Sequence, residues 1–210
     1  MAERTEDVAP AERVGEIIEA TSHAFVAQSV RLHQAPPFGS LVRVPVADTD
    51  LYAVVAETRT ASLEASGRPI ARGYADIVDA AIYRENPDLE HVLRTEFRAL
   101  LVGFRAGSTV FQHLPALPPP LHYSVYTCRP SEVVAFTARL DYLRTLLAGP
   151  AALADELVAA STRLAAAARG HEQGEAFLLQ VGRALALLLR DDYDRLTAIL
   201  RRLRPEEPWR

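Results

Sequence analysis

The sequence contains no lysine, and all 23 of its basic residues are arginine. This absence excludes two kinds of chemistry. The phosphate-binding loop GxxxxGK[ST] needs a lysine to contact the β- and γ-phosphates of a nucleotide. Imine-forming enzymes need a lysine amine as their nucleophile. This chain therefore contains neither a P-loop ATPase motor nor a lysine Schiff-base site.

Cysteine is nearly as scarce. Cys128 is the only one, so no disulfide can form within the chain. The first residues, MAERTEDVAPAER, lack the basic start and apolar core of a signal peptide. No uninterrupted apolar run approaches the roughly 18 residues that suggest a membrane span. These features favour a cytoplasmic protein that does not enter a membrane.

Recognisable catalytic and metal-binding patterns are also missing. The six histidines are scattered without the HxxxH or HExxH spacing of zinc sites. Neither the GxSxG motif of hydrolases nor the GxGxxG motif of dinucleotide-binding folds is present. We therefore predict no catalytic residue, no metal ligand and no cofactor site, and a protein that is not an enzyme.

Short strands are predicted over residues 14–63. The segments VGEIIEA, AFVAQSVRL, LVRVPV and LYAVVAETRT contain apolar residues at alternate positions, which is typical of half-buried strands. In LVRVPV this alternation places Val42, Val44 and Val46 on one face. Turn signals such as QAPPFGS separate the segments. Four short strands with turns between them indicate a barrel or a sandwich.

The middle of the chain interrupts this pattern. ADIVDAAIYRENPDLEHVL contains short helical turns, and we interpret the helical excursion at about 74–93 as a lid over one end of the barrel. FRALLVGFRAGSTVFQHL then returns to strands, with AGS as the turn of a hairpin.

The segment LPALPPPLH is the best candidate for a linker. Its prolines favour an extended polyproline conformation. Two interpretations remain open: the segment is a flexible hinge, or it packs along the wall of the barrel.

Helical periodicity begins after LHYSVYTC. Ser131 is expected to be the N-cap of a first helix that ends at Gly149 and Pro150. A second helix is predicted through AALADELVAASTRLAAAAR, ending at Gly170. A third helical stretch over about 172–203 has apolar residues at spacings of three and four. This last stripe can pack within the domain or against a partner.

The order of these segments resembles a known family. The run VGEIIEATSHAFVAQSVRLHQAPPFGSLVRV, followed by YAVVAETRT, RPIARG, YRENPDLEHVLRTEFRALLVGF and LPPPLHYSVY, is similar to the HerA/ATP-synthase (HAS) barrel family. The C-terminal FLLQVGRALALLLRDDYDRLTAIL resembles the tail of a short bacterial group, frequent in cyanobacteria, that carries this barrel without a motor. The resemblance covers nearly the whole chain, and its motifs specify a fold rather than an activity.

Strand patterns and resemblance together predict an α+β fold. A small closed N-terminal β-barrel is expected at residues 12–128, followed by a C-terminal helical domain of three or four helices at residues 129–210. In rotary ATP synthases and HerA-type DNA translocases, a similar barrel precedes the P-loop domain and helps to hold the ring of subunits together. This chain lacks the lysine for such a motor, so no catalytic residue is carried over from those ATPases.

Two apolar features are candidates for contacts with a partner. Phe38 in the PPFG turn is expected either to anchor a neighbouring subunit or to plug the end of its own barrel. The last helical stretch offers Tyr193, Leu196, Leu200 and Leu203 as a docking surface.

Charged clusters have two interpretations each. Five arginines from successive barrel elements either converge on a groove for nucleic acid or form a solvated surface. They are Arg31, Arg43, Arg59, Arg68 and Arg72. The terminal arginines at positions 201, 202 and 204 either offset the helix dipole or bind phosphate weakly.

The acidic cluster of Asp191, Asp192 and Asp194 is expected to be solvated within the last helical stretch rather than to bind a cation. Arg190 and Arg195 are its expected partners at i,i+4 spacing.

The expected function is that of a non-enzymatic assembly or adaptor module. Its barrel would serve oligomerisation or docking onto a HerA-like ATPase or an associated nuclease, and its helical tail would supply a second apolar surface. The alternative is a nucleic-acid-binding accessory protein that uses the barrel arginines. The net charge of −4 gives the whole chain no attraction for phosphates, so that alternative needs a local basic patch.

Overall fold

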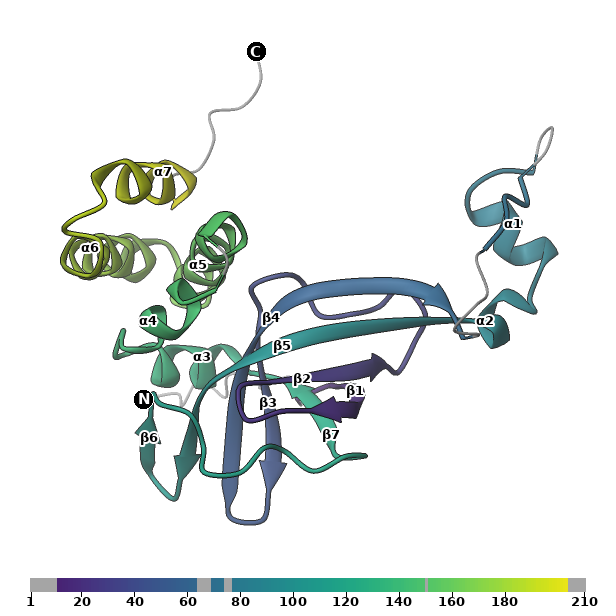
Figure 1. Ribbon diagram of the computed structural model, residues 1–210, viewed down its shortest axis with the longest axis horizontal. Helices are drawn as coiled ribbons and strands as arrows, with labels where there is room; N and C mark the ends of the chain where they lie inside the picture. Colours follow the sequence, from purple (N-terminus) through teal and green to yellow (C-terminus); the bar gives the residue numbers. More distant parts are fainter. Residues whose placement is uncertain (1–10, 64–68, 74–76, 150, 204–210) are drawn as a thin grey trace, which may run out of the picture.

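A computed structural model describes residues 11–63, 69–73, 77–149 and 151–203. Its N-terminal part is a closed β-barrel, as predicted, and the barrel consists of six antiparallel strands (Figure 1). Around the barrel the strands follow the order β2, β1, β7, β3, β4, β5, and β5 pairs back with β2 to close it. The strands are β1 (Arg13–Ala20), β2 (Ala24–Ser29), β3 (Leu41–Val46), β4 (Thr49–Ser62), β5 (Leu93–Ala106), β6 (Thr109–Phe111) and β7 (Ser124–Thr127). Strand β6 pairs with the end of β5, outside the ring.

Apolar side chains at alternate positions of the strands fill the barrel. Val42 and Val44 of β3 are fully buried, which confirms the predicted face of LVRVPV. They pack in one cluster with large side chains from the other five strands of the ring, among them Ile17, Phe25, Leu51, Phe97 and Val125. One face of each strand therefore makes a continuous apolar core.

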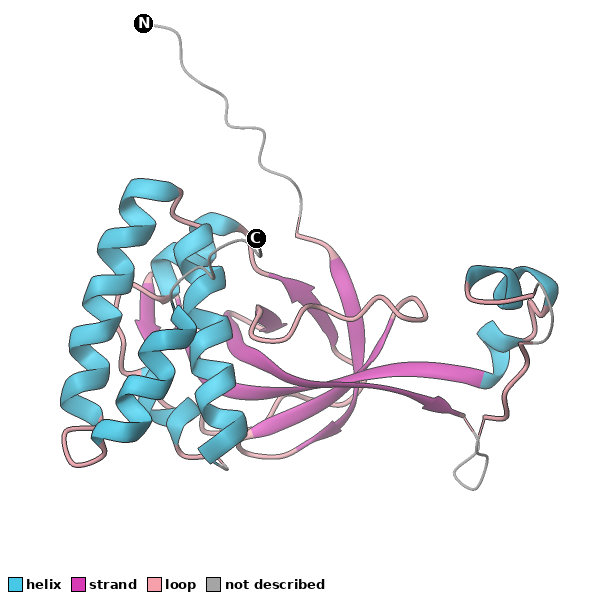
Figure 2. Ribbon diagram, turned by 90° about the horizontal axis from the view of Figure 1, so that it is seen from above, coloured by secondary structure: helices cyan, strands magenta, loops and turns pink. Residues whose placement is uncertain are grey.

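The helical excursion consists of α1 (Ala80–Glu85) and α2 (Leu89–Val92). Both lie beyond the far ends of β4 and β5, at the opposite end of the molecule from the C-terminal helices (Figures 1 and 2). The expected lid over the barrel is therefore wrong. The long β4–β5 ribbon carries these short helices away from the core, and no residue of α1 is buried.

The proline-rich segment lies between β6 and β7, inside the barrel domain. His122 donates its backbone N–H to the carbonyl oxygen of Ile17, and Ile17 donates to that of Tyr123. Of the two open interpretations, packing along the barrel wall is the one observed. The segment is not a linker to the helices, because β7 follows it and completes the ring.

Five helices follow the barrel in the described residues, one or two more than predicted. They are α3 (Pro130–Phe136), α4 (Tyr142–Leu147), α5 (Ala151–Ala167), α6 (His171–Leu188) and α7 (Tyr193–Leu203). Helix α5 matches the predicted second helix. Both neighbouring stretches are broken in two, the first between Phe136 and Tyr142 and the last between Leu188 and Tyr193. None of the helices in the described residues is long and apolar enough to cross a lipid bilayer.

The expected N-cap Ser131 is also wrong. Arg129 is the N-cap of α3, Pro130 follows it inside the first turn, and the Glu132 carboxylate accepts the backbone N–H of Arg129 at 2.8 Å. Proline suits the first helical position because that position makes no intrahelical N–H bond.

A second apolar core joins the helices to the barrel. Tyr52, Val54 and Val102 point outward from β4 and β5 and belong to the same buried cluster as Leu143 of α4 and Leu157 of α5. In Figure 1 the helices cover the outer face of β4 and β5 at one end of the barrel. The two parts of the chain are therefore held by a shared core rather than by a linker.

Candidate functional site

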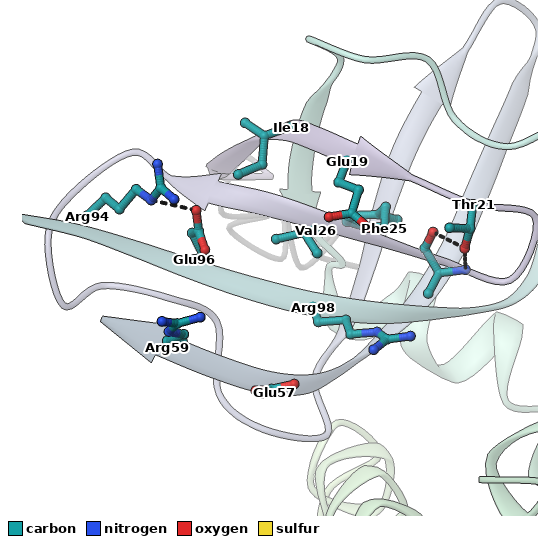
Figure 3. Close-up of a pocket in the computed structure, with 11 residues that line it drawn as sticks. Ile18, Glu19, Thr21, Phe25, Val26, Glu57, Arg59, Arg94, Glu96 and Arg98 are labelled. Atoms are coloured by element: carbon teal, nitrogen blue, oxygen red, sulfur yellow. Dashed lines mark hydrogen bonds and ion pairs between the residues drawn. The ribbon is translucent and has the colours of Figure 1, made fainter. Parts of the chain in front are cut away.

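A groove lies on the outer face of the barrel, where β1, β2, β5 and β4 are neighbours (Figure 3). Its volume is about 420 Å³. Among the described residues, six charged side chains line it, three acidic and three basic: Glu19, Glu57, Glu96, Arg59, Arg94 and Arg98. We call this feature the outer groove.

Strand register explains why these charges gather. Glu57 of β4 lies opposite Arg98 of β5, and Arg59 lies opposite Glu96. Directly opposite residues share a face of the sheet, and this face points away from the core that Phe97 helps to fill. An extra residue in β4 between Val55 and Glu57 shifts the register of its pairing with β5. Along the outer face of β4, the apolar residues that contact the helices are therefore followed by the charged residues of the groove.

Only part of this charge is neutralised within the groove. Arg94 forms an ion pair with Glu96, with 2.7 Å between Nε and Oε1. Among the residues that the structure describes, Arg59, Arg98, Glu19 and Glu57 form no ion pair within 4.0 Å. Within the described part of the chain, the groove therefore presents two arginines and two glutamates without an ion-pair partner.

An apolar pocket continues the groove toward the helices. Glu57 and Arg98 line both spaces, and the pocket adds Leu146 of α4 and the side chains of Leu153 and Leu157 of α5. Its volume is about 290 Å³. Leu153 is 48% exposed although it borders an apolar surface. The charged groove thus lies directly beside an apolar recess. This arrangement suits a ligand that is itself amphipathic.

Of the two interpretations of the five barrel arginines, convergence on one groove is not observed for the described ones. Arg43 is held by Asp50 at 3.1 Å and by Glu132 at 3.2 Å, and its guanidinium lies over the Tyr126 ring. Arg72 pairs with Asp88 at the distant helical excursion. Arg31 is exposed in the turn after β2, outside the groove.

Arg59 lines the outer groove. Arg68 lies outside the described residues. Strand register and ion pairing therefore keep the described arginines apart, so they do not converge on one groove.

The predicted apolar interface is mostly internal. Leu203 is buried, and Leu196 and Leu200 pack against the same cluster that joins the helices to the barrel. The last stripe thus packs within the domain, and only Tyr193, at 75% exposure, remains available to a partner. Phe38 is half-buried against this cluster, so it neither projects as an anchor nor plugs the barrel.

The acidic cluster differs from its predicted pairing. Asp191 pairs with its neighbour Arg190, and Asp192 accepts the backbone N–H of Arg195 at the start of α7. The Arg195 guanidinium reaches Asp155 of α5 at 2.7 Å. The i,i+4 pairs do not form because the helix breaks at this point, although the carboxylates are exposed as expected.

The terminal arginines also have internal roles. Arg202 pairs with Glu156 of α5, whereas Arg201 is exposed and Arg204 lies outside the described residues. Within the described ranges, no group of three or more His, Cys, Asp or Glu side chains is arranged to hold a metal ion.

Sequence reasoning missed most of the outer groove. Arg94, Arg98 and Glu96 alternate with buried residues along β5, and that alternation signals one charged outer face on this strand. The neighbouring β4 carries the matching alternation at Glu57 and Arg59. What the sequence does not show is the pairing of β5 with both β2 and β4, which brings the three strands together.

The chain was also compared with protein-family models and with curated proteins. Neither comparison finds a match. The geometry of the outer groove and its apolar pocket is therefore the ground on which a function can be proposed.

Proposed function

We propose that the protein is a non-enzymatic assembly module that docks a segment of a partner protein in the outer groove and its apolar pocket. The observation that supports this most is the position of Glu57 and Arg98. Both stand at the junction of the two spaces, and neither is neutralised by an ion pair among the described residues.

The groove specifies the chemistry of the docked segment. A carboxylate on the partner would meet Arg59 or Arg98, and a basic group would meet Glu19 or Glu57. A large apolar side chain would fill the pocket beside Leu153. The apolar anchor supplies most of the affinity, because exposed ion pairs contribute only about 0 to 1 kcal/mol each. The charges then set the orientation of the segment.

The class of partner is a further part of this proposal. The resemblance to the HAS barrel and the absence of lysine support a barrel that docks onto an ATPase motor formed by another chain. We propose a HerA-like ATPase or an associated nuclease in the cytoplasm as that partner.

Nucleic acid is the less favoured ligand. The described lining of the groove carries three arginines and three glutamates, so these residues give no net positive charge to attract phosphates. Two of the other candidate arginines, Arg43 and Arg72, are already ion-paired.

Affinity capture from the source cells tests docking. Tagged wild-type protein should retain a partner that Arg98→Glu and Leu153→Asp each lose by about tenfold or more. The matched control is Leu117→Asp, at an exposed site outside the groove. The retained partner is then purified, and its affinity is measured directly for four proteins: the wild type and the variants Arg98→Glu, Leu153→Asp and Leu117→Asp. Equal binding by all four proteins would contradict the proposal.

Titration with labelled DNA tests the alternative. Phosphate contacts would give binding at about 50 mM salt that weakens steeply at about 200 mM. We expect no binding at the lower salt concentration.

A further inference from the structure

Helix α6 has two faces of different character. Its inner face carries Gly174, Phe177, Val181 and Leu185, which are buried. Phe177, Val181 and Leu185 belong to the cluster that includes residues of α5 and α7. The opposite face carries Glu172, Glu175, Leu179, Arg183 and Leu187, all exposed. At about 100° per residue these five lie within a sector of about 120°. We call them the outer stripe.

The two leucines of the outer stripe are among the most exposed large apolar side chains in the described part of the chain. Leu179 is 67% exposed and Leu187 is 78% exposed. In Figure 1, α5 lies between α6 and the barrel, so the outer stripe faces away from the rest of the molecule. The stripe is therefore accessible to another protein along the length of the helix.

The charges of the outer stripe change sign along the helix. Its N-terminal part is acidic, with Glu172 and Glu175, and its C-terminal part is basic, with Arg183. Arg183 and Glu172 form no ion pair among the described residues, and Glu175 has only a distant contact of 3.8 Å with His171. A parallel copy of this helix would place like charges together, whereas an antiparallel copy would place opposite charges together.

From this pattern we infer that a second copy of the chain docks on the outer stripe, with the two α6 helices antiparallel about a twofold axis. Glu175 and Arg183 are equally far from Leu179 along the chain. With Leu179 near the axis, Glu175 of each protomer meets Arg183 of the other, and Leu187 covers the first turn of the opposite helix. A twofold interface makes each of these contacts twice.

This surface is separate from the outer groove, and the inference does not depend on what the groove binds. Arg98→Glu should leave the dimer intact, and variants of the outer stripe should leave capture of the groove partner intact. Failure of one proposal is therefore distinguishable from failure of the other.

Charge reversal on the outer stripe tests the dimer, with mass in solution measured by sedimentation equilibrium. The wild-type protein should be a dimer. Glu175→Arg and Arg183→Glu should each weaken self-association by about tenfold, because two attractive pairs per dimer become repulsive. Mixing the two variants should restore association, since every reversed charge then meets its complement. The double variant should restore it within a single chain for the same reason.

The matched control is Glu85→Arg, which reverses an exposed charge in α1. It should dimerise as the wild type does, and circular dichroism should give the same helical signal for all variants. A wild-type monomer, single reversals that dimerise normally, or a mixture as weak as its two components would each overturn the inference.

Discussion

Gln112, in the loop after β6, donates from Nε2 to the carbonyl oxygen of Phe136 at 2.6 Å. The same amide donates to the carbonyl oxygen of Arg139 at 3.0 Å, and its oxygen accepts the backbone N–H of Tyr142 at 3.1 Å. One side chain thus satisfies the end of α3 and the start of α4. Backbone groups at helix ends need such partners when water is excluded, so Gln112 stabilises the break between the two helices.

Replacement of this amide should be costly. Gln112→Met keeps a similar shape but leaves three backbone groups without a partner, and Gln112 is only 9% exposed. We expect the free energy of unfolding to fall by about 2 to 4 kcal/mol. Urea denaturation measures it. Gln34→Met, at an exposed turn, is the matched control and should change stability little; equal effects of the two substitutions would contradict this role.

The break at Gln112 also shows what local patterns can and cannot predict. Alternating apolar residues predict β1 to β5 because each strand buries one face in the barrel, as Val42 and Val44 do. The single helix expected from Ser131 onward is wrong because the residue that stabilises its interruption lies about 25 positions upstream. Contacts between distant segments leave no periodic signal.

The same limit applies to the candidate site. Glu57 and Arg59 alternate visibly along β4, and Arg94, Glu96 and Arg98 alternate along β5. Their arrangement in one groove depends on the register of β4, β5 and β2, which a single sequence does not fix. Arg43 and Arg59 both lie in predicted strands, and the sequence does not distinguish them. The structure shows that Asp50 and Glu132 neutralise Arg43 but not Arg59.

The ion pair between Arg43 and Glu132 joins the barrel to α3. Their side chains are 18% and 21% exposed, so water screens the pair only in part. Glu132→Gln should lower the free energy of unfolding by about 1 to 3 kcal/mol, because Arg43 then keeps Asp50 alone. Asp141→Asn is the control, since it breaks an exposed pair with Arg139. A loss at Glu132 no greater than at Asp141 in urea denaturation would remove this role.

Burial of Tyr52 predicts a loss of stability at high pH. Desolvation, with the nearby Cys128 thiol as a second cause, raises the pKa of Tyr52 to about 12 from its ordinary value of about 10. The folded state therefore keeps the phenol neutral over a range in which the unfolded state ionises it. The stabilisation is complete below about pH 10 and is lost as pH rises toward 12.

Tyr52→Phe removes this titration. Between pH 8 and about 11, the free energy of unfolding of the wild type should fall by about 1 kcal/mol more than that of the variant. Urea denaturation at each pH measures it. Tyr193→Phe, at a ring that is 75% exposed, should behave as the wild type does. Parallel pH curves for the wild type and Tyr52→Phe would contradict the prediction.

Gly39 positions the PPFG turn against α5. Its φ angle of +86° lies in the left-handed region, and an added Cβ would stand 2.7 Å from the Ala160 side chain and 2.8 Å from the Ser161 backbone nitrogen. Gly39→Ala should therefore cost both backbone strain and a clash with a helix that cannot move without disturbing the shared core.

We expect that substitution to lower the free energy of unfolding by about 2 to 4 kcal/mol. Gly107→Ala separates the two causes. Its φ angle is +58°, yet nothing lies within 4 Å of an added Cβ, so only the strain of about 1 kcal/mol remains. If thermal unfolding shows equal losses for the two variants, close contact between Gly39 and α5 does not contribute, and strain in the turn alone explains the glycine.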